Sequence, residues 1–199
     1  MSRNFNEAVE NRRSIYAIGK DVKVSLEDIQ KLVEHAVKHV PSSFNSQSAR
    51  VVVLFGDNHD KLWEITREEL RKIVPAEAFA STDEKINSFK NGYGTVLFFE
   101  DEAVVQSLQE QFALYKDNFP IWSLESSGML QFTVWTALED AGLGASLQHY
   151  NPLINEGVKN TWDLPANWKL LAQMPFGNAL AAPNEKQFSP LEGRVKVFA

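Results

Sequence analysis

Two short stretches of this sequence carry side chains suited to binding a polar ligand. Arg12, Arg13 and Ser14 directly follow a predicted helix. Two guanidinium groups beside a hydroxyl suit a phosphate, because arginine offers forked donors in a fixed geometry. Residues 41–50, PSSFNSQSAR, hold the densest group of neutral hydrogen-bonding side chains, which recognise a polyhydroxyl or heteroaromatic ligand without adding charge. The plainer interpretations are a solvated basic pair at the end of a helix and an ordinary polar loop after a proline.

Further candidate residues lie elsewhere in the chain. Arg194 and Lys196 alternate with valines near the C-terminus, where they would add positive charge for a phosphate or form the solvated face of an edge strand. His149 follows a long predicted helix at the point where the chain becomes extended. His35 and His39 have the i,i+4 spacing of a helical metal site, but no glutamate lies between them in an HExxH order. Surface histidines are therefore the favoured interpretation, and we expect no metal.

The sequence gives no support for a nucleophile supplied by the protein. It contains no cysteine, which excludes disulfides, thiolate catalysis and Cys-ligated metal centres. It has no G-x-S-x-G elbow for Ser-His-Asp catalysis and no G-x-G-x-x-G loop, since residues 142–146 are too short a match. We therefore expect no catalytic side chain of these classes.

Composition and charge narrow the class of protein. The 199 residues are 44% hydrophobic and 23% charged, which is ordinary for a globular domain. The net charge of -6 argues against a nucleic-acid binder, which needs a concentrated basic face. The N-terminal residues have no apolar core of the kind found in a signal peptide, so we expect a cytoplasmic protein.

The segment that must organise these residues is 122–150. Its first part predicts a helix of about twenty residues, capped by Ser123 or Ser126 and stopped by Gly142 and Gly144. Apolar side chains surround this helix almost completely, but polar and acidic residues interrupt them, so we expect a buried helix and no membrane span. One small domain rarely covers a helix on all sides. A partner subunit would supply the missing cover.

Helices and strands alternate along the rest of the chain. Helices are predicted at residues 4–12, 57–73, 81–92 and 151–161, and after the caps Ser25 and Asp101. The 81–92 helix opens with STDE, which looks like a capping box. Residues 51–55 are wholly apolar, which predicts a strand covered on both faces, and TVLFF at residues 95–99 predicts a second buried strand. Two more strands are predicted at residues 144–150 and 168–177. This order implies an α/β or α+β domain with a small central sheet.

Six segments, in their order along the chain, resemble the nitroreductase superfamily. They are RRSIYAI, PSSFNSQSAR, YGTVLFFED, the long helix ending in AGLGASLQHYNP, MPFGNALAAPNEK and SPLEGRVKVF. The resemblance covers nearly the whole chain and is closest to the branch named after the yeast fatty-acid-repression-mutant protein. It implies a single FMN-binding domain over residues 1–199, with the α+β fold of a nitroreductase-like sandwich: a central, mainly antiparallel sheet flanked by helices.

The resemblance also implies an assembly. Members of the superfamily form intertwined homodimers that bind two FMN molecules at the subunit interface. The long central helix forms much of that interface. A C-terminal arm, here about residues 184–199, embraces the partner.

The same resemblance assigns individual residues to FMN. The residues matched to its phosphate, ribityl chain and ring edge are Arg12, Arg13 and Ser14, with Arg194 as a C-terminal basic residue on the phosphate. The residues matched to a polar loop that reaches FMN from the other subunit are Ser43, Asn45 and Gln47. The residues matched to the stretch against the isoalloxazine ring, where a backbone N–H approaches N5, are Leu147, Gln148 and His149. A lysine near the pyrimidine edge is matched by Lys85 or, alternatively, by Lys90.

The activity implied by the resemblance is that of an FMN-dependent oxidoreductase. FMN would take hydride from NADH or NADPH and pass it to a nitroaromatic or quinone-like acceptor, in a ping-pong scheme that needs no protein nucleophile. Aromatic side chains that would line the acceptor side are Tyr115, Phe119, Trp122 and Tyr150, although core packing accounts for them equally well. Two alternatives stay open: a flavin enzyme of the same fold with a different reaction, and a flavin-binding regulatory or lipid-response protein with incidental reductase activity.

Overall fold

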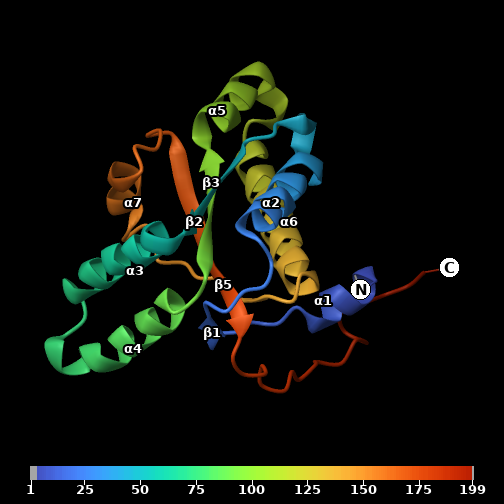
Figure 1. Ribbon diagram of the computed structural model, residues 1–199. Coiled ribbons are helices and arrows are strands. Elements are labelled where there is room, and N and C mark those ends of the chain that lie inside the picture. The colour runs from blue at the N-terminus through green and yellow to red at the C-terminus, as the bar shows by residue number, and fades with distance from the viewer. Residues whose placement is uncertain (1–3, 199) are drawn as a thin grey trace.

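An antiparallel sheet forms the centre of the protein (Figure 1). The computed structural model describes residues 4–198. The strands are β1 (Ile18–Gly19), β2 (Ala49–Phe55), β3 (Gly94–Asp101), β4 (Gly144–Ala145) and β5 (Trp168–Ala179). They lie in the order β1-β5-β3-β2, with β4 paired to β5, and these strand pairings are antiparallel. The predicted α+β class with a mainly antiparallel sheet is confirmed. The domain limits expected at residues 1 and 199 lie outside the described residues.

Helices cover both faces of this sheet. They are α1 (Phe5–Asn11), α2 (Leu26–His39), α3 (Gly56–Arg71), α4 (Phe79–Lys90), α5 (Glu102–Gln111), α6 (Phe119–Asp140) and α7 (Asn155–Thr161), with the 3-10 turns η1 (Ser43–Asn45), η2 (Ala76–Ala78) and η3 (Ala113–Tyr115). Helices α2 and α6 pack on one face, against Val96 and Phe98 of β3. Helices α3, α4 and α7 pack on the other face, against Leu97 and Phe99 (Figure 1). Because successive side chains of a strand point to opposite faces, β3 is buried along its whole length.

Two strand predictions need correction. Residues 51–55 lie in β2, but β2 ends the sheet in this chain, so only Leu54 is fully buried and the strand is not covered on both faces. Residues 144–150 form a strand only at Gly144–Ala145. The Pro175 carbonyl oxygen in β5 accepts a hydrogen bond from the Ser146 N–H at 3.3 Å, but Pro175 has no N–H to return one, so the ladder stops there. The chain stays beside β5 through a single bridge between Gln148 and Gln173.

Two helices begin at their predicted caps. Ser25 precedes α2, and its hydroxyl oxygen accepts a hydrogen bond from the Asp28 N–H at 3.0 Å. Asp101 precedes α5, and its carboxylate accepts a hydrogen bond from the Ala103 N–H at 3.1 Å. Each cap pairs an N–H group that the helix itself leaves without a partner.

Two other predicted caps are wrong. Helix α4 starts before Ser81, because the turn η2 leads directly into it, and the Ser81 hydroxyl bonds to a carbonyl oxygen three residues earlier. Helix α6 starts before both Ser123 and Ser126. Pro120 lies in its first turn, where the N–H that proline lacks would have no partner within the helix. The hydroxyls of Ser123 and Ser126 donate to carbonyl oxygens of the preceding turn instead.

Helix α6 confirms the long helix predicted at the centre of the chain, with 22 residues. Gly142 follows it with a φ of 82°, a left-handed conformation that glycine adopts without strain. One side of the helix is buried, and it presents Leu130, Val134 and Leu138 to the sheet. The other side exposes the apolar side chains of Ile121, Leu124, Met129 and Phe132. A single subunit therefore leaves part of this apolar helix uncovered.

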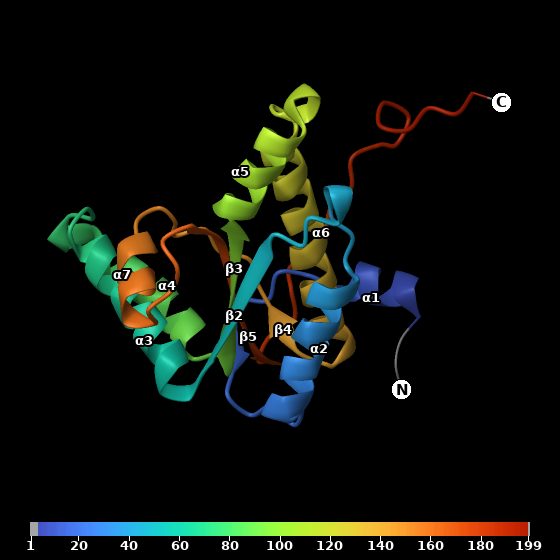
Figure 2. The ribbon, with the colours of Figure 1, turned by 90° about the horizontal axis from the view of Figure 1, so that it is seen from above.

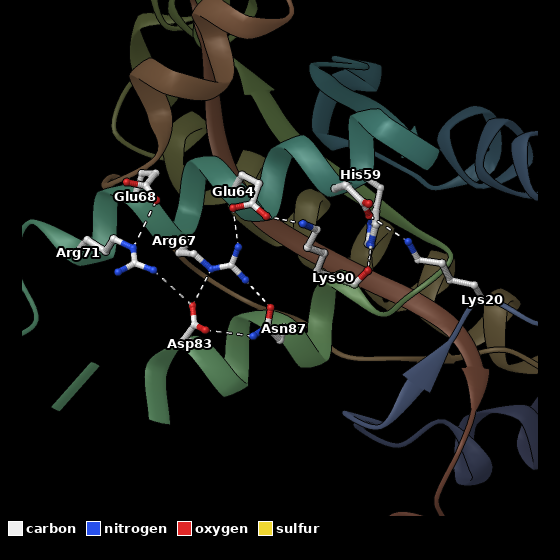
Figure 3. Close-up of polar contacts among 10 residues, drawn as sticks. Lys20, His59, Glu64, Arg67, Glu68, Arg71, Asp83, Asn87 and Lys90 are labelled. Atoms are coloured by element: carbon white, nitrogen blue, oxygen red, sulfur yellow. Dashed lines mark hydrogen bonds and ion pairs between the residues drawn. The ribbon is translucent and has the colours of Figure 1, made fainter. Parts of the chain in front are cut away.

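Helices α3 and α4 are fastened to each other by polar contacts (Figure 3). The Arg67 guanidinium donates to Asp83 at 2.7 Å and also contacts Glu64 and Asn87. Lys90 of α4 pairs with the same Glu64 of α3. The charges of this network thus neutralise one another within one subunit.

Two expectations concern metals and location. Within residues 4–198, no helix has both the length and the apolar character needed to cross a membrane. No group of three or more His, Asp or Glu side chains in that range is arranged to hold a metal ion. His35 and His39 are exposed, with ring centroids 4.4 Å apart. The cytoplasmic location stays a prediction.

Candidate active site

The fold brings two of the three predicted ligand-binding stretches into contact. Ser14 forms a parallel bridge with Ala145, and the Ile15 N–H donates to the Ala145 carbonyl at 2.9 Å. Gly144 makes this approach possible, because a Cβ at that position would lie 2.8 Å from the Ile15 side chain. The two arginines that precede Ser14 therefore lie at the start of the segment that follows β4.

Arg12 is held in place by an aromatic ring. Its Cζ atom lies 4.4 Å from the ring centroid of Trp135 on α6, a cation–π contact. Its Nε is buried and has no hydrogen-bond partner among the described residues. Burial lowers the pKa of Arg12, and the neighbouring charge of Arg13 lowers it further. A bound anion would satisfy the bare donor and reduce the repulsion between the two arginines.

Arg13 lines a hollow of about 370 Å³ next to Arg12. Its Nη2 donates to the carbonyl oxygen of Asn184 at 2.6 Å, where the C-terminal arm leaves the sheet. Ser14 and Tyr16 line the same hollow. The predicted phosphate-binding side chains thus border an open space that a ligand can enter.

Along the segment after β4, backbone N–H groups that donate to β5 alternate with N–H groups that do not. The Gln148 N–H donates to the Gln173 carbonyl at 2.7 Å, and the Gln173 N–H donates back at 2.9 Å. The Gln148 side chain is buried and donates to Ser146 at 3.0 Å. The N–H groups of Leu147 and His149 have no hydrogen-bond partner in the described part of the chain. A backbone contact to a ligand would therefore come from Leu147 or His149, because Gln148 is engaged in the sheet.

The third predicted stretch, residues 42–48, has an unusual backbone. Phe44, Asn45 and Gln47 have φ values of 57°, 51° and 47°. Residues other than glycine rarely adopt this conformation, which costs about 1–3 kcal/mol each and persists only where the surroundings enforce it. Ser42 helps to enforce it, because its Oγ accepts a hydrogen bond from the Gln47 N–H at 3.0 Å. Strain retained in this way is typical of functional sites.

Phe44 anchors this loop with a ring that is 50% exposed. Its centroid lies 4.9 Å from that of Phe112, 5.2 Å from that of Phe119 and 5.8 Å from that of Tyr115. The Trp122 ring is stacked on it, with centroids 6.0 Å apart and planes at 19°. Each such aromatic pair contributes about 0.5–1.5 kcal/mol beyond buried area. Three aromatic residues predicted for the acceptor side therefore gather around the loop.

The loop and Arg12 contact α6 near its opposite ends. Trp122 packs on the loop and Trp135 packs on Arg12. Thirteen residues separate these tryptophans, which corresponds to about 20 Å along a helix. The structure therefore does not bring Ser43, Asn45 and Gln47 to Arg12 within one subunit.

Three predicted basic residues lie apart both from Arg12 and from the loop at residues 42–48; they are Lys85, Lys90 and Arg194. Lys85 is exposed on α4, on the face of the sheet opposite α6. Lys90, the alternative, is engaged by an acidic side chain of α3. Arg194 is on the exposed C-terminal arm, which runs away from the sheet (Figure 2), and its Nη1 donates to a carbonyl oxygen of the same arm at 3.4 Å. The roles predicted for these residues stay predictions.

Two aromatic residues have roles that the sequence does not distinguish. Tyr150 packs against Trp63 and Phe89 in the core, where burial raises its pKa to about 12, so it belongs to the core rather than to an acceptor wall. Trp135 supports Arg12, although its position in an apolar helix predicts ordinary packing. No signal in the sequence would have separated the two cases, because the contacts join distant segments.

The sequence matches the model of the Nitroreductase family over residues 9–178. The chain belongs to the nitroreductase family. The matched range includes both arginines, the loop at residues 42–48 and the segment after β4. Membership makes the chain an oxidoreductase by class and confirms the superfamily predicted from the sequence.

Three relatives give this assignment more detail. Nitroreductase FRM2 of Saccharomyces cerevisiae is 35% identical over 188 residues, which are 93% of each chain, and it confirms the predicted branch. Nitroreductase CinD from Lactococcus lactis in complex with chloramphenicol is 48% identical and has a TM-score of 0.91, covering 98% of this chain and 100% of that chain. A CinD structure in complex with 4-nitrophenol has a TM-score of 0.90. A protein from Exiguobacterium sibiricum in complex with FMN, 15% identical over 100% of this chain and 99% of that one, shares the fold with a TM-score of 0.74.

Proposed function

We propose that this nitroreductase-family chain uses FMN and NADH or NADPH to reduce nitroaromatic or quinone-like acceptors. The observation that carries the proposal is the contact between Ser14 and Ala145. This contact sets Arg12 and Arg13 beside the unpaired N–H groups that follow β4. Groups suited to the phosphate and to the ring of FMN thus lie next to each other in one subunit.

The chemistry of Arg12 and Arg13 fits the phosphate of FMN. A phosphate monoester carries a charge of about -1.5 to -2 at neutral pH. It would accept a hydrogen bond from the buried Nε of Arg12. Trp135 already fixes this guanidinium, so little side-chain freedom would be lost on binding. Arg194, on the exposed C-terminal arm, would add positive charge from a second chain.

The backbone after β4 fits the flavin ring. The chemistry supplied by bound FMN would be hydride transfer from NADH or NADPH to an acceptor. The N–H of Leu147 or His149 would orient the ring at its N5 edge. The part of the protein in this reaction is to bind, orient and shield the flavin, which agrees with a chain that contains no cysteine.

We also propose a homodimer in which the loop at residues 42–48 reaches the FMN of the other subunit. The distance of about 20 Å between this loop and Arg12 along α6 supports an exchange between subunits. The exposed apolar side of α6 supports it as well, since burial of one large apolar side chain stabilises by about 1.5–3 kcal/mol. A groove of about 730 Å³ between α2 and the edge strand β2 leaves room for a segment of the second chain.

The acceptor class is proposed from CinD. Chloramphenicol and 4-nitrophenol, the ligands of its two structures, both carry a nitro group on a benzene ring. The rings of Phe44, Tyr115 and Trp122 offer this chain an aromatic surface beside the loop. A flat, electron-poor acceptor would stack on such a surface.

Absorbance spectra and steady-state assays test the cofactor and the reaction together. Protein mixed with FMN and freed of excess should keep flavin absorbance near about 450 nm. NADH or NADPH should bleach this band, and 4-nitrophenol or a quinone should restore it. A protein that stays colourless contradicts the proposal. Tight FMN binding with negligible turnover would favour the regulatory alternative.

Mixed dimers test the exchange of the loop. Arg13→Ala and Asn45→Ala should each weaken FMN binding in both sites of a homodimer. If the loop serves the other subunit, a heterodimer of the two variants keeps one intact site and carries both defects in the second. If each loop serves its own subunit, both sites are defective. FMN titration of purified heterodimers therefore distinguishes half-occupancy at wild-type affinity from uniformly weak binding.

A further inference from the structure

Helix α2 carries two histidines on a side that is not used for packing on the sheet. Val33 and Ala36 form its buried side, which belongs to the core between the sheet and α6. Another side, which includes Lys38, lines the groove beside β2, and His35 and His39 are not among the described residues that line it. Both histidines are exposed. A second chain lying in the groove would therefore leave the two rings accessible.

The two imidazole rings are close enough to share one metal ion. Their centroids are 4.4 Å apart, and the ring planes are inclined at 44°. A first-row metal ion lies about 2.0–2.1 Å from a coordinating imidazole nitrogen and therefore about 3.2 Å from the ring centroid. Two rings bound to one ion at a right angle would have centroids about 4.5 Å apart, whereas two rings at a tetrahedral angle would have them about 5.2 Å apart. The observed separation matches the right-angle arrangement.

The backbone of α2 fixes this spacing. Side chains four residues apart lie one above the other on the same face of a helix. The Val40 N–H donates to the Ala36 carbonyl oxygen, so helical hydrogen bonding continues past His39 to the end of α2. Within residues 4–198 neither ring has a hydrogen-bond partner, which leaves the nitrogen lone pairs available to a metal.

The charges around the pair are compatible with a bound cation. His39 is the last residue of α2, and the partial negative charge at the C-terminus of a helix stabilises a positive ion. Lys31, one turn before His35, forms an ion pair with Glu27 at 2.7 Å, which offsets its charge. Lys38 lies on the side of the groove. These exposed lysines therefore oppose a bound ion only weakly, because water and salt screen their charges.

We propose that His35 and His39 form a binding site for Cu²⁺, with water in the remaining coordination positions. Cu²⁺ prefers a square-planar arrangement, in which neighbouring ligands meet at right angles, and it binds nitrogen ligands more tightly than Ni²⁺ or Zn²⁺ does. A structural zinc site needs four ligands in a tetrahedral arrangement, which two histidines do not supply. The missing glutamate of an HExxH pattern argues against zinc in the sequence, and the ring geometry selects a different metal. The site does not rest on the proposed function, because α2 contributes no residue to the proposed FMN contacts.

Titration of the full-length chain with copper sulfate, followed by calorimetry and electron paramagnetic resonance, tests the proposal. We expect one strong Cu²⁺ site per chain, with two ring nitrogens coordinated to the ion. His35→Gln and His39→Gln should each weaken Cu²⁺ binding by about a hundredfold, because a second ligand held in place raises the effective ligand concentration. Both side chains are exposed, so both variants should fold like the wild type.

A rearranged variant separates the pair from the histidine content of the chain. Gln30→His combined with His39→Gln exchanges two exposed side chains of α2 and leaves the composition unchanged. Residues 30 and 35 are five positions apart, about 140° around the helix, so rings at these positions do not reach one ion. This variant should bind Cu²⁺ as weakly as His39→Gln. Wild-type affinity in the rearranged variant or in both single variants overturns the inference, as does a spectrum in which fewer than two ring nitrogens coordinate the ion.

Discussion

The two faces of the sheet differ in how completely their polar groups are satisfied. On the α3–α4 face, Arg67 is largely buried and contacts Glu64, Asp83 and Asn87 (Figure 3). Opposite charges meet there within one subunit. This network joins two helices and leaves no role for a ligand, so its contribution is to the stability of the fold.

The α2–α6 face contains buried polar atoms and backbone conformations that are energetically unfavourable. Arg12 and Glu100 each bury one polar atom without a hydrogen-bond partner among the described residues. Three residues of the loop at residues 42–48, Phe44, Asn45 and Gln47, have left-handed backbones. Such costs persist where a ligand or a second chain compensates for them. The comparison predicts that changes on the α3–α4 face alter stability alone, whereas changes on the α2–α6 face alter FMN binding.

Protonation of His59, on the α3–α4 face, should give the largest effect. The fully buried ring lies 2.8 Å from the Thr95 hydroxyl and 3.2 Å from the Lys90 carbonyl, and burial lowers its pKa to about 4. The unfolded chain binds this proton near pH 6.5, so stability that is present above pH 6.5 is lost as the pH falls toward 4. The loss should reach about 3 kcal/mol.

Urea unfolding at several pH values measures this effect. His59→Asn removes the titration, so its free energy of unfolding should depend less steeply on pH between 4 and 6.5, although the variant is less stable throughout. An unchanged slope in His59→Asn would assign the acid sensitivity to other groups. The ratio of FMN affinities of variant and wild type should stay constant over this range.

Arg67→Ala tests the complete network directly. It leaves three partly buried polar partners without their common donor, so we expect a loss of about 2–3 kcal/mol in the free energy of unfolding. Lys72→Ala removes an exposed pair on the same helix region and should cost about 0.5 kcal/mol or less. Both variants, once folded, should bind FMN like the wild type. A selective loss of FMN by Arg67→Ala would show that the two faces are coupled.

Arg12→Ala is the corresponding change on the ligand-binding face. Loss of one charge-assisted contact to the phosphate should weaken FMN binding by about 2 kcal/mol, or about thirtyfold. The FMN-free protein should lose only about 1 kcal/mol of stability, because the substitution removes the cation–π contact with Trp135 while the buried Nε has no hydrogen-bond partner to lose. Arg71→Ala, the same substitution at a half-exposed arginine of α3, serves as the control for FMN titration. Equal affinities of the Arg12 and Arg71 variants would remove Arg12 from the phosphate site.

The features predicted correctly from the sequence are mostly local. Ser25 and Asp101 cap their helices through residues two or three positions away, and Gly142 ends α6 through its own backbone. The cap predicted at Ser81 fails because the preceding turn η2 already starts the helix, a competition between neighbouring segments that the STDE pattern does not reveal.

The site depends on contacts between distant segments, and these were less accessible. Composition and spacing found Arg12 and Arg13, but only the family resemblance connected them with the segment after β4. Neither approach indicated that the Gln148 N–H donates to the Gln173 carbonyl oxygen. A continuous apolar strand such as β3 predicts burial of its apolar residues, but it does not show which polar group will be buried at its end.

Two substitutions of Phe44 separate the ring from the backbone on the ligand-binding face, with the smallest effect expected here. Both Phe44→Ala and Phe44→Gly lose the contacts with Trp122 and its aromatic neighbours. Glycine adopts the φ of 57° without strain. For alanine this left-handed backbone costs about 1 kcal/mol, and alanine has no ring whose contacts would hold it there. We therefore expect Phe44→Ala to bind FMN about fivefold more weakly than Phe44→Gly. Equal FMN affinities would mean that the aromatic contacts, rather than the left-handed backbone, determine the shape of the loop.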